Sequence, residues 1–142
     1  MTRINLIDPT ELLDQHLFAE WREAPRVITM AHAWVERQAA PLPPPVFCLG
    51  SGHMTFFGWR TSWLSARHAQ LRDELLSRGY TLSHIGDLPV IEGFDIAWEP
   101  SAADVALSRA RLRERFLKRP GWYRLRGVPA EMTHYTESED EA

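Results

Sequence analysis

The chain has 142 residues, of which 44% are hydrophobic, and a formal net charge of −3. This length suits one domain that buries about two-thirds of its unfolded surface, and the hydrophobic content excludes a disordered chain. No apolar run approaches the ~18 residues that a membrane-spanning helix needs, and the N-terminus lacks a signal-peptide core, which predicts a cytoplasmic protein. The single cysteine, Cys48, lies in an apolar run and is predicted to be a buried structural thiol.

The acidic charge is concentrated at the C-terminal end. Residues 131–142 contain five acidic residues and no Lys or Arg, so without them 14 acidic residues stand against 16 basic ones. We therefore predict a folded domain over residues 1–130 and an acidic, disordered tail over residues 131–142. Two interpretations of the tail remain open: weak competition with phosphate for a basic face, or solubility alone.

A long helix is predicted after a short extended arm at residues 2–6. Asp8 is a suitable N-cap, Pro9 suits the first helical position, and Glu11 completes a capping box. We expect Pro25 to kink this helix, which ends near residues 37–39, before the proline-rich connector at residues 40–45. At about 100° per residue, one stripe gathers the apolar side chains of Leu13, Leu17, Trp21, Ala24, Ile28, Ala31 and Val35.

The polar face of this helix suggests a functional site. Gln15, Arg22 and Arg26 lie opposite the apolar stripe, with His16 and Glu23 at its shoulder. A face that is only solvated usually mixes Glu and Lys, whereas this one gathers arginines around one carboxylate.

The middle of the chain is predicted to be scaffold. Residues 46–58 resemble a buried strand-like run followed by a glycine turn at residues 50–52, which is weak evidence for a phosphate cradle. His53 is interpreted as a hydrogen-bonded structural histidine rather than a DNA contact. A second helix is predicted over residues 62–78, with Gly79 following it and residues 80–99 irregular. Its inner face carries Leu64, His68, Leu71 and Leu75.

A third helix is predicted from Ser101, boxed with Asp104, to Pro120. Residues 109–119 contain six basic residues and one acidic residue, and Arg111, Arg115 and Lys118 share a face. That face is either simply solvated or, together with Arg22 and Arg26, a track for backbone phosphates. The six histidines of the chain show no metal-type spacing, so no metal site is predicted.

Six blocks occur in order along the chain: MTRINL, DQH, AEWREAPRV, LGSGHMTFF, ARL and RPGWY. Together they resemble the phage and bacterial pyrimidine-dimer DNA glycosylases of the dimer-specific endonuclease V type, over about residues 1–127. The resemblance implies an all-α, single compact domain of about three main helices, with long irregular connections and an N-terminal arm packed between the helices. It also implies a nucleoid-associated monomer that excises UV-induced pyrimidine dimers from double-stranded DNA with damaged bases, has AP lyase activity and uses no metal or cofactor.

The resemblance also assigns roles to residues. Removal of Met1 exposes the α-amine of Thr2 as nucleophile, and Glu23 is the catalytic carboxylate. An α-amine, with a pKa of about 7.7–8.0 against about 10.4 for lysine, has the larger neutral fraction near pH 7. The DNA-binding residues that the resemblance implies are Arg3, Gln15, His16, Arg22, Arg26, Trp122, Tyr123 and Arg124, and the basic face of the third helix adds Arg111, Arg115 and Lys118.

Two departures from the family keep alternatives open. The connector at residues 40–45 is less basic than in the family, and Leu125 and Arg126 stand where the family is rich in tyrosine. The same chemistry could therefore act on another damaged or abasic nucleotide. A DNA-binding protein without catalysis is the third possibility. Trp122 and Tyr123 could also simply cap the core.

Overall fold

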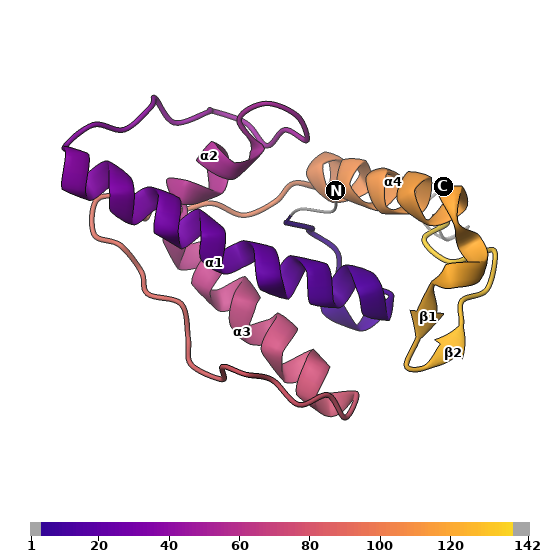
Figure 1. Ribbon diagram of the computed structural model, residues 1–142. Coiled ribbons are helices and arrows are strands. Elements are labelled where there is room, and N and C mark those ends of the chain that lie inside the picture. Colours follow the sequence, from indigo (N-terminus) through magenta and orange to yellow (C-terminus); the bar gives the residue numbers. More distant parts are fainter. Residues whose placement is uncertain (1–3, 138–142) are drawn as a thin grey trace.

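Three long helices dominate the computed structural model, which describes residues 4–137 (Figure 1). This confirms the predicted all-α domain of about three main helices. The helices are α1 (Asp14–Arg37), α2 (His53–Gly58), α3 (Thr61–Ser77) and α4 (Ala102–Lys118), and the short elements are the 3-10 turns η1 (Pro9–Glu11) and η2 (Pro120–Trp122) and the strands β1 (Arg124–Leu125) and β2 (Val128–Pro129).

The long first helix begins later than predicted. Asp8 is an N-cap and accepts a hydrogen bond from the Thr10 amide at 2.9 Å, but it caps only the turn η1. Leu12 and Leu13 then adopt extended backbone, and α1 starts at Asp14. Both leucines are fully buried and belong to the same apolar cluster.

The apolar stripe of α1 is confirmed at five of its seven positions. Leu13, Leu17, Ala24, Ile28 and Ala31 are buried, and Trp21 is half-buried. Val35 is 47% exposed, and the neighbouring Trp34 is buried instead. Trp34 packs against Gly58 of α2, where an added Cβ would lie 2.6 Å from the indole ring, so this contact requires glycine.

The predicted strand-like run at residues 46–58 is wrong, because its second half forms α2. Gly52 turns the chain with φ +93°, a backbone conformation that favours glycine, and His53 starts the helix. Phe56 and Phe57 are both fully buried in the short helix. Consecutive buried aromatic residues are therefore compatible with a helix that is covered on two sides, which a pattern of alternation cannot reveal.

The other two long helices match their predictions closely. On α3, Leu64, His68, Leu71 and Leu75 are all buried, and His68 stacks on Trp21 with ring centroids 6.1 Å apart. α4 opens with the predicted capping box, which is closed by reciprocal hydrogen bonds between Ser101 and Asp104. Within the described residues, no helix is both long and apolar enough to cross a membrane.

The N-terminal arm is packed between the helices, as predicted, and joins the two parts of the core. Ile4 and Leu6 belong to an apolar cluster with α2 and the middle of α1, whereas Ile7 belongs to a second cluster with the start of α1 and with α4. Figure 1 shows the arm passing between α1 and α4.

Residues 131–137, which were predicted to belong to a disordered tail, pack against the domain. Tyr135 is 5% exposed, and its hydroxyl oxygen accepts a hydrogen bond from the Leu13 amide at 2.8 Å. Arg113 of α4 donates to the carbonyl oxygens of Met132 and His134 at 3.1 and 2.7 Å. Burial of Tyr135 and these hydrogen bonds hold the segment on the domain although its composition is acidic. Residues 138–142 lie outside the described part of the chain.

Candidate functional site

Each residue of the arm from 4 to 7 is tied to a different helix. The Ile4 amide donates to Nε2 of His53 on α2 at 3.1 Å, and the Asn5 side chain donates to Glu20 on α1 at 3.0 Å. The Leu6 amide donates to the Ser108 hydroxyl on α4 at 3.0 Å. The Ile7 carbonyl oxygen accepts a hydrogen bond from the side chain of Arg67 on α3. Because buried backbone groups need partners, these bonds fix the path of the arm through the core.

A buried ion pair secures the middle of this arrangement. Arg67 of α3 binds Glu20 of α1 through two parallel hydrogen bonds of 2.8 and 3.0 Å, and its remaining nitrogen donates to the Ile7 carbonyl oxygen. The side chains of Arg67 and Glu20 are 5% and 0% exposed. A buried carboxylate is tolerated when its oxygens are fully hydrogen-bonded, and here the amide of Asn5 completes the set.

Glu23 lies on α1 one turn beyond this ion pair and has a different environment. Its carboxylate is 3.6 Å from the guanidinium of Arg26, and the two side chains are 11% and 69% exposed. Arg22 is exposed, with its guanidinium 5.3 Å from the centroid of the Phe18 ring. A loosely paired carboxylate at the edge of an arginine-bearing face can stabilise a nearby positive charge or accept a proton.

Thr2, the predicted catalytic partner of Glu23, and Arg3, a predicted DNA contact, lie outside the described residues, so their roles stay predictions. The arm reaches the described region at Ile4, whose side chain shares an apolar cluster with Ala24, the neighbour of Glu23.

The structure gives Gln15 an internal role. Its side-chain nitrogen donates to the Trp122 carbonyl oxygen at 2.7 Å, and its side-chain oxygen accepts from the Arg124 amide at 3.1 Å. Both ends of the amide are therefore engaged with the C-terminal segment. The predicted contact of Gln15 with DNA stays a prediction, and it would compete with these two bonds.

His16 is also held inside the protein. It is 2% exposed, its Nδ1 is 2.8 Å from the Tyr135 hydroxyl oxygen, and its ring lies 4.6 Å from that of Tyr123. Burial lowers the pKa of His16 to about 4, and the charges of His134 and Arg115 act in the same direction. The imidazole is thus neutral near pH 7 and covered by two tyrosines, so its predicted DNA contact would require that cover to move.

Asp14, which the sequence analysis did not single out, holds the hairpin of β1 and β2. Its carboxylate accepts from the backbone amides of Arg126 and Gly127 at 3.0 and 2.9 Å and from the side chain of Arg78 at 2.8 Å. Burial opposes ionisation of Asp14, but these hydrogen bonds, that of Gly127 foremost, hold its pKa below its ordinary value. Both turn residues have positive φ, as a two-residue hairpin turn requires.

Two basic residues of α4 lie beside the glycine turn, which the sequence did not predict. A pocket of about 430 Å³ is lined by the turn at residues 50–52 together with Arg111 and Arg115. Arg111 also pairs with Glu114 at 3.1 Å, and Lys118 lies 3.9 Å from the same carboxylate. Exposed pairs of this kind are weak, so these cations remain available to a stronger anion.

The aromatic residues after α4 divide between surface and core. Trp122 is 49% exposed, with the guanidinium of Arg119 4.8 Å from its ring centroid. Tyr123 is 9% exposed and packs 5.7 Å from Phe116, and its burial raises the pKa of its hydroxyl. Tyr123 therefore caps the core, whereas Trp122 and the exposed Arg124 face solvent.

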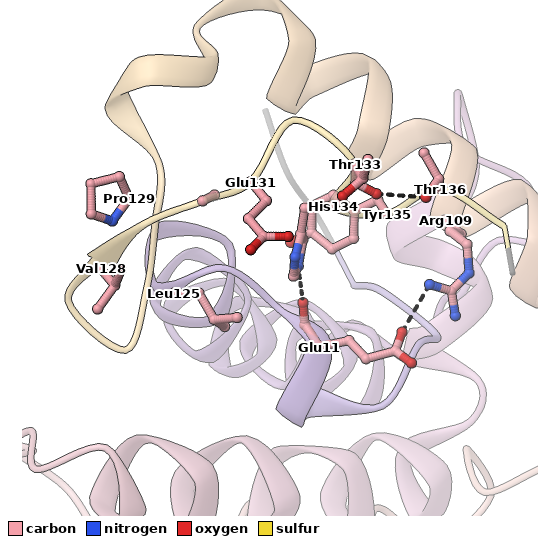
Figure 2. Close-up of a pocket in the computed structure, with 11 residues that line it drawn as sticks. Glu11, Arg109, Leu125, Val128, Pro129, Glu131, Thr133, His134, Tyr135 and Thr136 are labelled. Carbon is pink, nitrogen blue, oxygen red and sulfur yellow. Dashed lines mark hydrogen bonds and ion pairs between the residues drawn. The ribbon is translucent and has the colours of Figure 1, made fainter.

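A second pocket, of about 510 Å³, lies between η1, α4 and residues 128–136 (Figure 2). Glu11 and Arg109 form an ion pair of 2.8 Å across it, and Nε2 of His134 is 2.6 Å from the Glu11 carbonyl oxygen. These contacts fasten the C-terminal segment to the domain. We interpret this pocket as part of that attachment.

No sequence pattern pointed to four of the residues that hold the arm, which are Asn5, Glu20, Arg67 and Ser108. Arg67 and Glu20 each lie next to apolar positions of their helices, so charged residues beside a buried stripe were the available signal. Among the described residues, no group of three or more His, Cys, Asp or Glu side chains is arranged to hold a metal ion.

A model of a known protein family matches this chain. The family model described as pyrimidine dimer DNA glycosylase matches residues 1–85. The match spans more than half of the chain and includes the arm, α1, α2 and α3, with Glu23, Arg22, Arg26 and the ion pair that secures the arm.

Proposed function

Because this chain belongs to the pyrimidine dimer DNA glycosylase family, we propose that it excises UV-induced dimers through the α-amine of Thr2 and then cleaves the strand as an AP lyase. Membership of the family indicates the glycosylase activity on damaged DNA. The amine nucleophile, the Schiff base and the lyase step are the parts that we propose.

The single observation that carries the proposal is the fixed path of the arm toward Glu23. Asn5 is bonded to Glu20, and Glu23 lies three residues, or about 4.5 Å, farther along α1. Ile4 shares its apolar cluster with Ala24 and Val27, so the arm runs toward the C-terminal part of α1 as it approaches its own terminus. Two residues extend at most about 7 Å beyond Ile4, a reach that suits an amine working beside Glu23.

The chain offers few alternative amines. Lys118 is the single lysine among the 142 residues, and it lies in the last turn of α4 with a side chain that is 64% exposed. Model-peptide α-amines have a lower pKa than lysine side chains, about 7.7–8.0 against about 10.4, so they have the larger neutral fraction near pH 7. The N-terminal amine is therefore the better nucleophile.

The proposed reaction begins at C1′ of the 5′ nucleotide of the dimer. The amine nitrogen forms a bond to C1′, the glycosidic bond breaks, and its electron pair leaves with the pyrimidine, which takes up a proton. Loss of one proton from the nitrogen and transfer of a proton to O4′ open the sugar ring and give a protonated Schiff base, which keeps the second N–H proton. Removal of a C2′ proton then expels the 3′ phosphate by β-elimination, and water releases the enzyme from the sugar.

Glu23 is suited to two steps of this proposed reaction. Its carboxylate, paired with Arg26 only at 3.6 Å, is free to stabilise the positive charge that develops on the sugar. It is also a base of the right kind to move protons during ring opening and elimination. The neighbouring Glu20 cannot take this part, because Arg67 and Asn5 occupy its oxygens.

The arginines of α1 and α4 are suited to contacts with the DNA backbone. Arg22 and Arg26 lie on α1, and Arg111 and Arg115 lie beside the glycine turn. Contacts with phosphates on both sides of a lesion favour a bent duplex, and a damaged site is easier to bend and to open because its stacking is already weakened. A nucleotide turned out of the duplex would give the amine access to C1′.

Reduction with borohydride tests the proposal, because it converts a protein–sugar Schiff base into a stable adduct. We expect the protein to be trapped on duplexes that contain a pyrimidine dimer and on duplexes that contain an abasic site. The Lys118→Arg variant should be trapped equally well, since it keeps the charge and removes the competing amine. Trapping on abasic DNA alone would support the same chemistry on another substrate, and no trapping on either duplex would contradict a Schiff base.

A further inference from the structure

The imidazole of His53 is held on both of its nitrogens. Nδ1 lies 2.7 Å from the carbonyl oxygen of Cys48, and Nε2 accepts a hydrogen bond from the Ile4 amide at 3.1 Å. A carbonyl oxygen can only accept, so Nδ1 carries the hydrogen and Nε2 presents its lone pair to the arm. The ring is 1% exposed and packs edge-on against Phe47 and Phe57, with centroids 5.7 and 5.1 Å away.

The hydrogen bond between the Ile4 amide and His53 lies close to the N-terminus, so it can affect the position of the terminal amine. The Ile4 amide is two residues from Thr2, nearer to the terminus than the Asn5, Leu6 and Ile7 groups that bond the other helices. Two residues have a short reach, so the position of the Ile4 amide limits the positions that the terminal amine can take. His53 itself is held by the Cys48 carbonyl and begins α2 directly after Gly52, which has φ +93°.

We propose that His53 is a positioning residue for the reacting amine, acting through its Nε2 acceptor on the Ile4 amide. The inference rests on the proposed function, because it concerns where the amine stands relative to C1′. A displacement of about 1 Å can lower the rate of a positioned reaction by about 100-fold. Loss of the Nε2 acceptor should therefore slow the chemical step while leaving the DNA-binding surface intact.

Substitution of His53 by asparagine or by glutamine distinguishes the roles of the two ring nitrogens. In His53→Asn, the shorter amide can still donate to the Cys48 carbonyl near the place of Nδ1 but cannot reach the Ile4 amide. In His53→Gln, the longer amide brings an acceptor oxygen near the place of Nε2. Ser108→Ala is the matched control, because it also removes a buried side-chain acceptor from an arm amide, that of Leu6, four residues from Thr2.

The test is the single-turnover rate of borohydride trapping on an abasic duplex at saturating protein, with the dissociation constant for that duplex measured separately. We expect His53→Asn to be slower by about 10-fold to 100-fold, with the dissociation constant changed by less than about 3-fold. We expect His53→Gln and Ser108→Ala to stay within about 3-fold of the wild-type rate. Thermal unfolding of all three variants establishes that they are folded.

Two results would overturn the role of His53 while leaving the proposed function in place. One is a wild-type trapping rate in His53→Asn, and the other is an equal loss of rate in Ser108→Ala. Should His53→Asn not fold, hydrogen exchange at the Ile4 amide takes its place: the proposal expects protection in both the wild type and His53→Gln, and an unprotected Ile4 amide in the wild type overturns it. Failure of the wild type to be trapped at all would overturn the proposed function and this inference with it.

Discussion

The first turn of α1 and the two turns that follow it carry similar residues but bind different parts of the molecule. In the first turn, Asp14, Gln15 and His16 hold the hairpin, the Trp122–Arg124 backbone and Tyr135. The next turns carry Glu20, which holds the arm, and Glu23, which has only a loose ion pair. Figure 1 shows the hairpin beside the start of α1 and the arm farther along it.

One helix thus carries residues that attach the C-terminal segment and, farther along, a residue that we propose takes part in the reaction. A side chain whose polar atoms all have protein partners stabilises the fold, and it can bind DNA only by giving those partners up. Asp14 and Gln15 are engaged in this way, and Nδ1 of His16 contacts Tyr135, so the first turn fastens the C-terminal segment. Glu23, whose described partner is Arg26 at 3.6 Å, is the carboxylate that we propose acts on the substrate. Four variants test the distinction.

The largest effect is expected from Glu23→Gln. Without the carboxylate, strand cleavage of dimer-containing DNA should fall by about 100-fold or more, while the dissociation constant for the same DNA stays nearly unchanged. The free energy of unfolding should fall by less than about 1 kcal/mol, because the partner Arg26 is exposed. Single-turnover cleavage and urea unfolding measure the two quantities, with the exposed Glu36→Gln on the same helix as control. Undiminished cleavage would refute the role of Glu23.

Glu20→Gln should show the reverse behaviour. It leaves the guanidinium of Arg67 buried without its counter-charge, which costs about 3–5 kcal/mol of unfolding free energy. Urea unfolding beside Glu23→Gln and Glu36→Gln measures this loss. A Glu20→Gln protein as stable as the wild type would show that the arm is not secured by the ion pair.

The third prediction concerns pH and the first turn of α1. Burial lowers the pKa of His16 to about 4, whereas an unfolded histidine titrates near 6.5. Between these values the unfolded chain binds a proton that the folded chain excludes, so stability falls as the pH drops from 6.5 to 4, by about 3 kcal/mol for this group. Above pH 6.5 the contribution is constant.

The measurement is urea unfolding from pH 7 to pH 4 in the wild type and in His16→Gln. Burial also lowers the pKa of His68, so the difference between the two proteins isolates His16. We expect a shallower loss of stability in the variant. Identical pH dependence would show that His16 is accessible to solvent, and so would favour its predicted contact with DNA.

The smallest effect is expected from Arg26→Ala. Removal of one phosphate contact should weaken DNA binding and lower the slope of log K against log salt by about 1. Arg72→Ala is the control, because Arg72 pairs with Asp87 at 2.6 Å. Titrations between low and moderate salt measure both slopes, and an unchanged slope for Arg26→Ala would remove Arg26 from the interface.

Local signals in the sequence predicted much of the fold. The capping box at Ser101, the apolar stripe of α3 and the end of α1 depend on residues within a few positions of one another, and all three are confirmed. The start of α1 and the helical character of residues 53–58 depend on long-range burial. The sequence alone could not predict them.

The candidate site likewise has features that the local sequence indicates and features that depend on long-range contacts. The polar face of α1 identified Glu23 and its arginines by spacing alone. The engagement of Gln15 with Trp122 and of His16 with Tyr135 joins positions more than 100 residues apart, which periodicity cannot predict. The resemblance implied that the arm packs between the helices, but its hydrogen bonds to four helices could not be predicted, because a short segment shows no pattern of its own.

The measurement that bears most directly on the proposed chemistry is peptide mapping, by mass spectrometry, of the protein–DNA adduct left after borohydride reduction. We expect the sugar fragment on the N-terminal peptide, attached to the α-amine of Thr2 with Met1 absent. Attachment to Lys118, or an adduct that forms while Met1 is retained, would contradict a nucleophile presented by the arm.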